Sequence, residues 1–206
     1  MLSNKKTVSA IIQKYRLLLE DYAYGENALH DLIHVASIIT STCLDLGIEC
    51  PVVVGGLAVE TYTNGGYTTT DIDFVTDSMV DIHRVMIRLG FSAKEGYRYY
   101  CHQRFGDVVE FPSPPLNGSK DKVVLIDLPN GLQYYVIGIE DIIINRLEEF
   151  VHWDSKNLKR ESATQIISIL KAHSDRIDYD YLHEQASQKD VSDGLDILLN
   201  ESSQSS

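Results

Sequence analysis

The sequence predicts an α+β fold, in which a mixed β-sheet is flanked by helices and followed by a C-terminal helical region. Three observations predict it. Apolar residues recur at helical spacing before residue 47. Residues 51–138 then alternate short apolar strands with helices and turns. Beyond Gly138 only helical patterns remain.

The chain divides accordingly into four regions. We expect N-terminal helices that pack on the core in residues 1–50, an α/β core in residues 51–138, a C-terminal helical region in residues 139–200, and a disordered tail in residues 201–206. The first region contains two predicted helices, residues 7–20 and 26–46, and Gly47 ends the second of them.

The core begins with the stretch from Pro51 to Thr76. It predicts a strand over residues 52–54, a glycine pair, one brief helix, a turn at Gly65-Gly66 and a strand that contains Asp71 and Asp73. Later elements are a helix over residues 79–89 with Ser78 as its N-cap, strands over 97–104 and 107–111, a loop rich in proline, and a hairpin of strands 122–128 and 133–137.

Helices alone are predicted after the core. Their expected ranges are residues 139–151, 161–172, 179–186 and 191–199. Asp178 and Asp190 stand where N-cap residues are expected, because a short acidic side chain accepts hydrogen bonds from the free N–H groups of a first turn.

Composition limits the classes of partner. The formal net charge is −12, from 30 acidic and 18 basic residues, so non-specific binding to DNA is not expected. A small anionic ligand remains compatible where metal ions or a basic cluster screen the charge.

Three cysteines without paired spacing indicate reduced thiols. The first residues have no apolar stretch of signal-peptide length and no segment is apolar enough to cross a membrane, so a cytoplasmic protein is expected.

Asp71 and Asp73 are the candidate metal ligands. Residues two apart on a strand point to the same face, so both carboxylates leave one side and repel each other unless a cation lies between them. Upstream, Gly55 and Gly56 follow a strand and precede a helix, where backbone N–H groups can approach a phosphate. The combination predicts a nucleoside triphosphate held with a divalent metal ion.

These residues resemble the signature of the polymerase-beta-like nucleotidyltransferase superfamily. The resemblance implies a nucleotidyltransferase-like sheet, a triphosphate held at Gly55 and Gly56, and Mg²⁺ (or Mn²⁺) held by Asp71 and Asp73. It also implies a third carboxylate on a later strand. Glu110 is preferred for this role because it alternates with apolar neighbours on a predicted strand; Asp127, beside the hairpin turn, is the alternative.

Within this superfamily, residues 52–153 resemble most the minimal bacterial nucleotidyltransferases and the AbiEii-like proteins of toxin–antitoxin systems. In related sequences an arginine stands where this chain has Tyr67. The missing cation would either weaken triphosphate binding or move the role to Arg84, Arg104, Arg146 or Lys156. Arg146 is preferred because it follows the sheet; an ion pair with Glu148 or Glu149 is the alternative for it.

The resemblance implies transfer of a nucleoside monophosphate to a hydroxyl of a protein partner or an RNA acceptor. Asp71, Asp73 and Glu110 would then be catalytic, and Glu110 would accept the proton of the attacking hydroxyl. Gly55, Gly56 and Arg146 would bind the triphosphate. The rival hypothesis is a non-catalytic toxin or antitoxin subunit that retains the fold; a plain metal-binding domain is a third.

Overall fold

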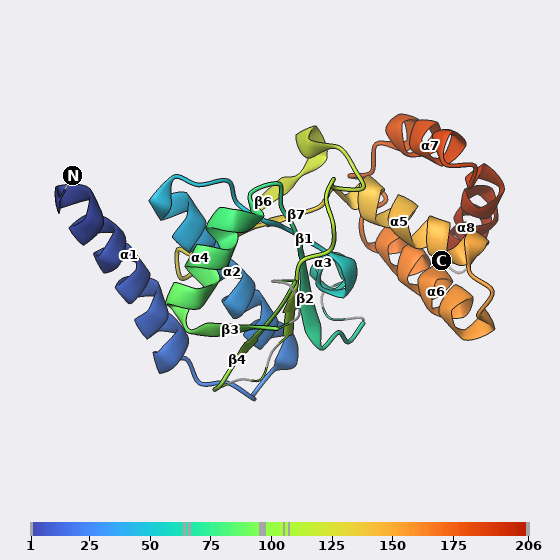
Figure 1. Ribbon diagram of the computed structural model, residues 1–206. Coiled ribbons are helices and arrows are strands. Elements are labelled where there is room, and N and C mark those ends of the chain that lie inside the picture. The colour runs from blue at the N-terminus through green and yellow to red at the C-terminus, as the bar shows by residue number, and fades with distance from the viewer. Residues whose placement is uncertain are drawn as a thin grey trace. The chain divides into compact units, whose positions relative to one another are not determined.

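The computed structural model describes residues 2–63, 65, 67–94, 98–104, 106 and 108–204. Gly66, Tyr97, Asp107 and the last two residues of the expected tail lie outside this range. Helices and all the described strands lie before residue 137, and from Ile139 onward the described residues form helices and connecting turns (Figure 1). The fold is therefore mixed α and β, as the sequence predicts.

Within the described residues, seven strands form one mixed sheet in the order β3-β4-β5-β2-β1-β7-β6. The strands are β1 (Val52–Val54), β2 (Asp71–Val75), β3 (Phe91–Lys94), β4 (Tyr99–His102), β5 (Val108–Glu110), β6 (Val124–Asp127) and β7 (Gln133–Val136). Parallel pairing joins β1 to β7 and β2 to β5, whereas the other neighbours are antiparallel. On the central strand β2, Ile72 and Phe74 are buried, while Asp71 and Asp73 alternate with them and are half-buried.

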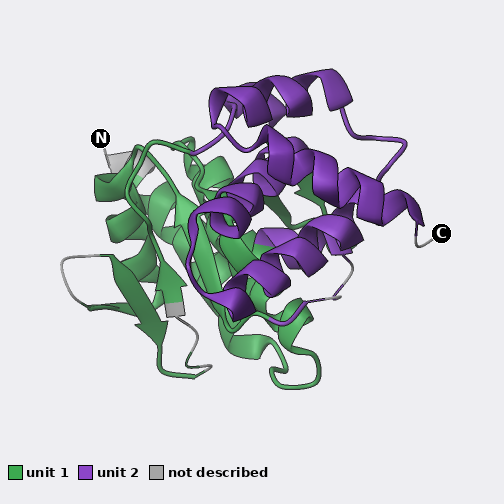
Figure 2. Cartoon of the chain, turned by 90° about the vertical axis from the view of Figure 1, so that its right-hand side faces the viewer, with its two compact units in different colours: residues 1–57, 69–116, 123–136 green, residues 58–68, 117–122, 137–206 purple. Residues whose placement is uncertain are grey.

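The described chain divides into two compact units (Figure 2). The first comprises residues 1–57, 69–116 and 123–136 and contains the sheet. Its helices are α1 (Leu2–Asp21), α2 (Ala28–Leu46) and α4 (Met79–Leu89). α2 contacts β7 and β2, α4 contacts β3, and α1 contacts both helices. Ile38, Ile72 and Phe74 are fully buried in this core.

The second unit comprises residues 58–68, 117–122 and 137–206. It contains α5 (Ile139–His152), α6 (Lys156–Ala172), α7 (Tyr179–Gln188) and α8 (Ser192–Gln204), together with the 3-10 turn Lys120–Lys122. α6 contacts α5 and α8, and α7 contacts the same two helices. One helix, α3 (Gly55–Thr63), begins in the first unit and ends in the second.

Several local predictions need correction. β3 was not expected, because Ser92 and Lys94 interrupt its apolar pattern; it exists because β4 pairs with it. Ser78 is the N-cap residue of α4, as predicted, but it makes no side-chain cap hydrogen bond, and its hydroxyl donates to Glu49. Asp178 caps α7 by accepting from the Tyr181 N–H, whereas Asp190 lies before α8 in the left-handed region at φ 58°.

The end of the chain also differs from the expectation of a frayed tail. α8 continues to Gln204, and the hydroxyls of Ser202 and Ser203 donate to the Leu199 carbonyl. Among the described residues, no helix is long and apolar enough to cross a membrane.

Candidate active site at the β2–β5 strand pair

The candidate carboxylates lie on adjacent parallel strands. In the register of β2 and β5, Asp73 is the partner of Glu110 and Asp71 is the partner of Val108. Ile72, Phe74 and Val109 are fully buried, while Asp71, Asp73 and Glu110 are half-buried. The alternation places the three acidic residues on one face of the sheet. The register places Glu110 beside Asp73, and the role of the three residues as metal ligands stays a prediction.

Asp127 lies in a different part of the sheet. It is the last residue of the edge strand β6, and β1 and β7 separate that strand from β2. Its register partner is Gln133, whose side chain donates to its carboxylate at 2.5 Å. Asp127 therefore does not join Asp71 and Asp73.

The glycine pair lies directly against an aspartate. Gly55 has φ +61°, a left-handed conformation that glycine adopts without strain. A Cβ atom at this position would lie 2.9 Å from Asp73 Cγ and closer still to Asp73 Oδ2. Residue 55 must be glycine for the Asp73 carboxylate to occupy this place. α3 begins at Gly55, so free N–H groups of a helix N-terminus are next to that carboxylate.

Asp71 is oriented by its own strand. The hydroxyl of Thr69 donates to Asp71 Oδ1 at 2.8 Å. Thr69 is itself buried, so this bond is partly shielded from water. It fixes one carboxylate oxygen and leaves the other for a further ligand.

Glu110 has a partner that the sequence did not indicate. Arg98 donates from Nε and from Nη2 to the same oxygen, Glu110 Oε1, at 3.1 Å and 3.0 Å. The Arg98 carbonyl accepts from the Phe111 N–H at 2.9 Å, which fixes its backbone beside β5. Its guanidinium lies over the Tyr99 ring. A contact between residues 12 positions apart in sequence depends on strand pairing, which no local motif reveals.

The three carboxylates have the hard oxygen donors that Mg²⁺ and Mn²⁺ prefer. The absence of a side chain at Gly55 leaves room for the Asp73 carboxylate against the start of α3. However, the described residues contain no group of three His, Cys, Asp or Glu side chains already arranged around a metal position. The donor chemistry fits a divalent cation, while the Glu110 carboxylate is paired with Arg98 in this structure.

Arg146 forms an ion pair on its own helix, which was the alternative to triphosphate binding. Its Nη1 pairs with Glu149 Oε1 at 2.6 Å on α5, with 14% of the arginine side chain exposed. Glu149 also accepts from the Ser162 hydroxyl at 3.0 Å. The pairing belongs to the second unit, and binding of triphosphate by Arg146 stays a prediction.

The remaining candidate cations have varied surroundings. Arg84 pairs with Asp81, Arg104 donates to the Tyr22 carbonyl, and Lys156 is exposed at the start of α6. Tyr67, which replaces the expected arginine, lines a hollow of about 270 Å³ in the second unit together with Thr63 and polar residues of α6.

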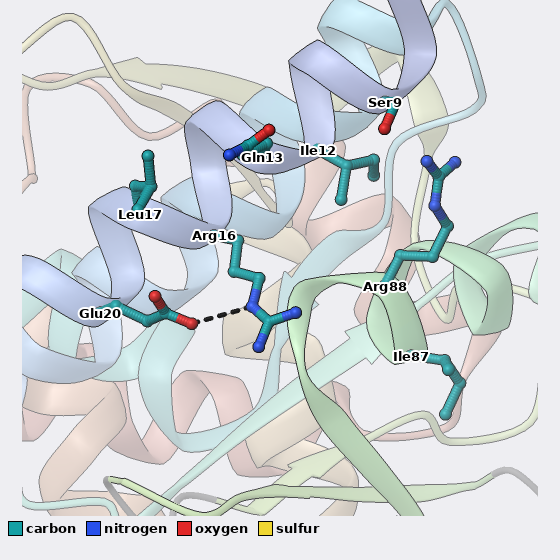
Figure 3. Close-up of a pocket in the computed structure, with 8 residues that line it drawn as sticks. All are labelled: Ser9, Ile12, Gln13, Arg16, Leu17, Glu20, Ile87 and Arg88. Atoms are coloured by element: carbon teal, nitrogen blue, oxygen red, sulfur yellow. Dashed lines mark hydrogen bonds and ion pairs between the residues drawn. The ribbon is translucent and has the colours of Figure 1, made fainter. Parts of the chain in front are cut away.

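A groove of about 560 Å³ lies between α1 and α4 in the first unit (Figure 3). Arg16 and Arg88 line it, with Leu17 and Ile87, whose exposed fractions are 47% and 45%. Arg16 Nε donates to Glu20 at 2.8 Å, as the dashed line shows. The groove thus combines exposed apolar side chains with two arginines in an acidic protein.

Comparisons with known proteins support the fold. The chain matches no protein-family model, and no curated protein is detectably similar to it in sequence. A solved structure is similar: an antigenic nucleotidyltransferase-like protein from Paracoccidioides brasiliensis, at 17% identity, a TM-score of 0.52, and coverage of 68% of this chain and 76% of that one. The chain therefore has a nucleotidyltransferase-like fold, while the AbiEii-like grouping stays a prediction.

Proposed function

We propose that the protein is a metal-dependent nucleotidyltransferase that transfers a nucleoside monophosphate from a triphosphate to a hydroxyl group. One observation supports this most directly: the Asp73 carboxylate lies against Gly55 at the start of α3, with Glu110 in register beside it. The start of a helix, where phosphates bind in many proteins, therefore lies beside carboxylates with the donor chemistry of metal ligands, and both occur on a nucleotidyltransferase-like fold.

In this proposal Asp71 and Asp73 hold Mg²⁺ or Mn²⁺, with Glu110 as the third ligand. The metal would neutralise phosphate charge and align the attacking and leaving oxygens. The N–H groups of Gly55 and Gly56 would donate to phosphate oxygens. The acceptor oxygen attacks the α-phosphorus, the bond to the β-phosphate oxygen breaks, and pyrophosphate leaves. Glu110 accepts the proton of the attacking hydroxyl.

The proposed acceptor is a protein hydroxyl, with an RNA terminus as the second choice. The net charge of −12 opposes close approach of a nucleic-acid backbone, so a partner protein suits the surface better. A role in a two-component toxin–antitoxin module, in the cytoplasm, follows from the sequence resemblance. Labelling of a neighbouring gene product with radioactive triphosphate tests this part of the proposal.

Titration calorimetry with ATP or GTP in the presence of Mg²⁺ tests the site itself. We expect the wild-type chain to bind and Asp73→Asn to lose binding. Asp127→Asn is the matched control, because that carboxylate lies on the edge strand β6, and it should bind as the wild type does. Equal affinity in wild type and Asp73→Asn, or no binding by either, contradicts the proposal.

One observation favours the rival, a non-catalytic interaction protein. The groove between α1 and α4 exposes Leu17 and Ile87 beside Arg16 and Arg88, which suits an acidic amphipathic segment of a partner. Under this hypothesis Arg88→Glu abolishes association with the partner while Asp73→Asn leaves it intact. Under the enzymatic hypothesis the partner becomes labelled, and Asp73→Asn prevents the labelling.

A further inference from the structure

We propose that Arg98 is the phosphate-binding cation of this site, and that its ion pair with Glu110 couples metal binding to nucleotide binding. The inference rests on the proposed function and adds a residue to it. It begins from the fork in which two N–H groups of Arg98 meet the single oxygen Glu110 Oε1. One carboxylate of the candidate metal set is thus held by a cation of the protein.

A metal ion and Arg98 compete for Glu110. Glu110 is the register partner of Asp73, so a cation bound by Asp73 lies within reach of the Glu110 side chain. Two positive groups at one carboxylate repel each other, and the guanidinium is the more weakly hydrated and the more movable of the two. With 48% of its side chain exposed, Arg98 has room to turn away when the metal engages Glu110.

Once the metal displaces the Arg98 guanidinium from Glu110, the guanidinium can bind a phosphate group. Its backbone is tied to β5 by the Phe111 N–H, so only the side chain moves. A guanidinium at the edge of this acidic face matches a phosphate oxygen pair through two parallel N–H groups. Arg98 would thereby supply the positive charge that Tyr67 does not provide. Arg146, by contrast, is already paired with Glu149.

The coupling predicts opposite effects on the two ligands. Without Arg98, Glu110 is free for the metal, so Mn²⁺ alone should bind Arg98→Ala about two- to five-fold more tightly than wild type. The triphosphate loses a charged donor, so ATP measured at saturating Mg²⁺ should bind about ten-fold more weakly. Arg98→Lys keeps the positive charge but has no pair of parallel N–H groups, so its affinity for ATP should lie between those of wild type and Arg98→Ala.

Electron paramagnetic resonance of free Mn²⁺ and calorimetry with ATP measure both effects on the full chain. Lys14→Ala is the control, since Lys14 forms an exposed ion pair with Asp45 at 3.1 Å outside the candidate site and should leave both affinities unchanged. Thermal unfolding followed by circular dichroism confirms that each variant is folded, and Arg98→Gln replaces Arg98→Ala should the latter unfold.

The outcomes separate the two proposals. Tighter Mn²⁺ binding with weaker ATP binding supports the coupling. Unchanged Mn²⁺ or unchanged ATP affinity in Arg98→Ala overturns it, while loss of both ligands in Asp73→Asn would still support the nucleotidyltransferase proposal. Failure of the wild type and of Arg98→Ala to bind either ligand overturns both proposals.

Discussion

Asp73 and Glu110 are register partners across the parallel strands β2 and β5. Neighbouring strands lie about 4.8 Å apart, so two carboxylates stand side by side on one face of the sheet. Like charges in this arrangement destabilise a sheet. Arg98 offsets the repulsion at Glu110 only in part, because it is itself about half exposed. The fold therefore holds a local electrostatic conflict that a bound cation would relieve.

The first prediction concerns this conflict. In metal-free buffer, Asp73→Asn should equal or exceed the wild type in free energy of unfolding, by up to about 1 kcal/mol, because one of two adjacent negative charges is removed. Urea denaturation with EDTA present measures it. Asp127→Asn, on β6, serves as control and should not gain stability, since Gln133 already donates to that carboxylate. A clear loss of stability in Asp73→Asn would refute the interpretation.

The second prediction concerns Gly55. Gly55→Ala introduces a Cβ atom against Asp73 Cγ and also occupies the left-handed region at φ +61°. We expect a loss of at least about 2 kcal/mol in stability, together with loss of triphosphate binding. Gly47→Ala is a matched control, with φ +66° and no atom within 4 Å of the added Cβ. Gly47→Ala should lose only the stability that corresponds to the strained left-handed backbone, about 1 kcal/mol. It should bind the triphosphate as the wild type does.

The third prediction concerns pH. The hydrogen bond from Lys122 at 2.8 Å holds the pKa of Asp178 below its usual value. A carboxyl with a lowered folded pKa contributes stability above its unfolded pKa, about 3.9, and loses it as pH falls through the folded pKa. Asp178→Asn keeps the α7 cap but removes the charge, so its Tm should lie below that of wild type at pH 7.

The gap in Tm between wild type and Asp178→Asn should begin to shrink as the pH falls below about 4 and should close once the pH passes the lowered pKa of folded Asp178, where the carboxyl is neutral. Scanning calorimetry from pH 2.5 to 7 follows it. Asp178→Ala also loses the acceptor for the Tyr181 N–H, so part of its deficit should persist in acid. A gap for Asp178→Asn that does not change with pH would show that the ion pair contributes no stability.

The fourth prediction concerns the buried carboxylate of α5. Asp141 is 2% exposed and accepts from the Tyr181 hydroxyl at 2.8 Å and the Ser119 N–H at 2.9 Å. Burial raises the pKa of Asp141, and the Tyr181 hydrogen bond lowers it again in part. Tyr181→Phe removes that donor, so we expect a loss of about 1–3 kcal/mol at neutral pH.

The sign of the pH dependence follows from the raised pKa. A group whose folded pKa is raised contributes stability at low pH and loses it as pH rises through the folded pKa. The deficit of Tyr181→Phe should therefore be larger at pH 8 than at pH 4. Urea denaturation at both values measures it, with Tyr179→Phe on the same helix as control. An equal deficit at the two pH values contradicts the role of the Asp141 charge.

Local patterns predicted the parts of the site that depend on local geometry. Strand alternation places Asp71 and Asp73 on one face, opposite Ile72 and Phe74, because the side-chain period of a strand is fixed. Gly55 marks the turn from β1 into α3 because it has a positive φ, which few other residues adopt.

The sequence did not predict the features that depend on strand pairing. β3 has a mixed polar sequence and is a strand because β4 hydrogen-bonds to it. The contact between Arg98 and Glu110 arises from the register that makes Tyr99 the partner of Glu110, which no spacing in the sequence shows. For Arg146, helix geometry already favours Glu149, three residues on, over Glu148, two residues on. The hydrogen bond from Ser162 of α6 to Glu149 is a further contact that the sequence does not show.

The stability cost of a substitution at Gly55 should depend on which residue occupies position 73. The space denied to a side chain at position 55 is filled by the carboxylate at position 73. A shorter residue at 73 vacates that space, so Gly55→Ala should cost less stability in an Asp73→Ala background than in the wild type, and the two effects should not add. In a deep mutational scan, positions 55 and 73 would then appear as an epistatic pair, with the tolerance of each set by the other.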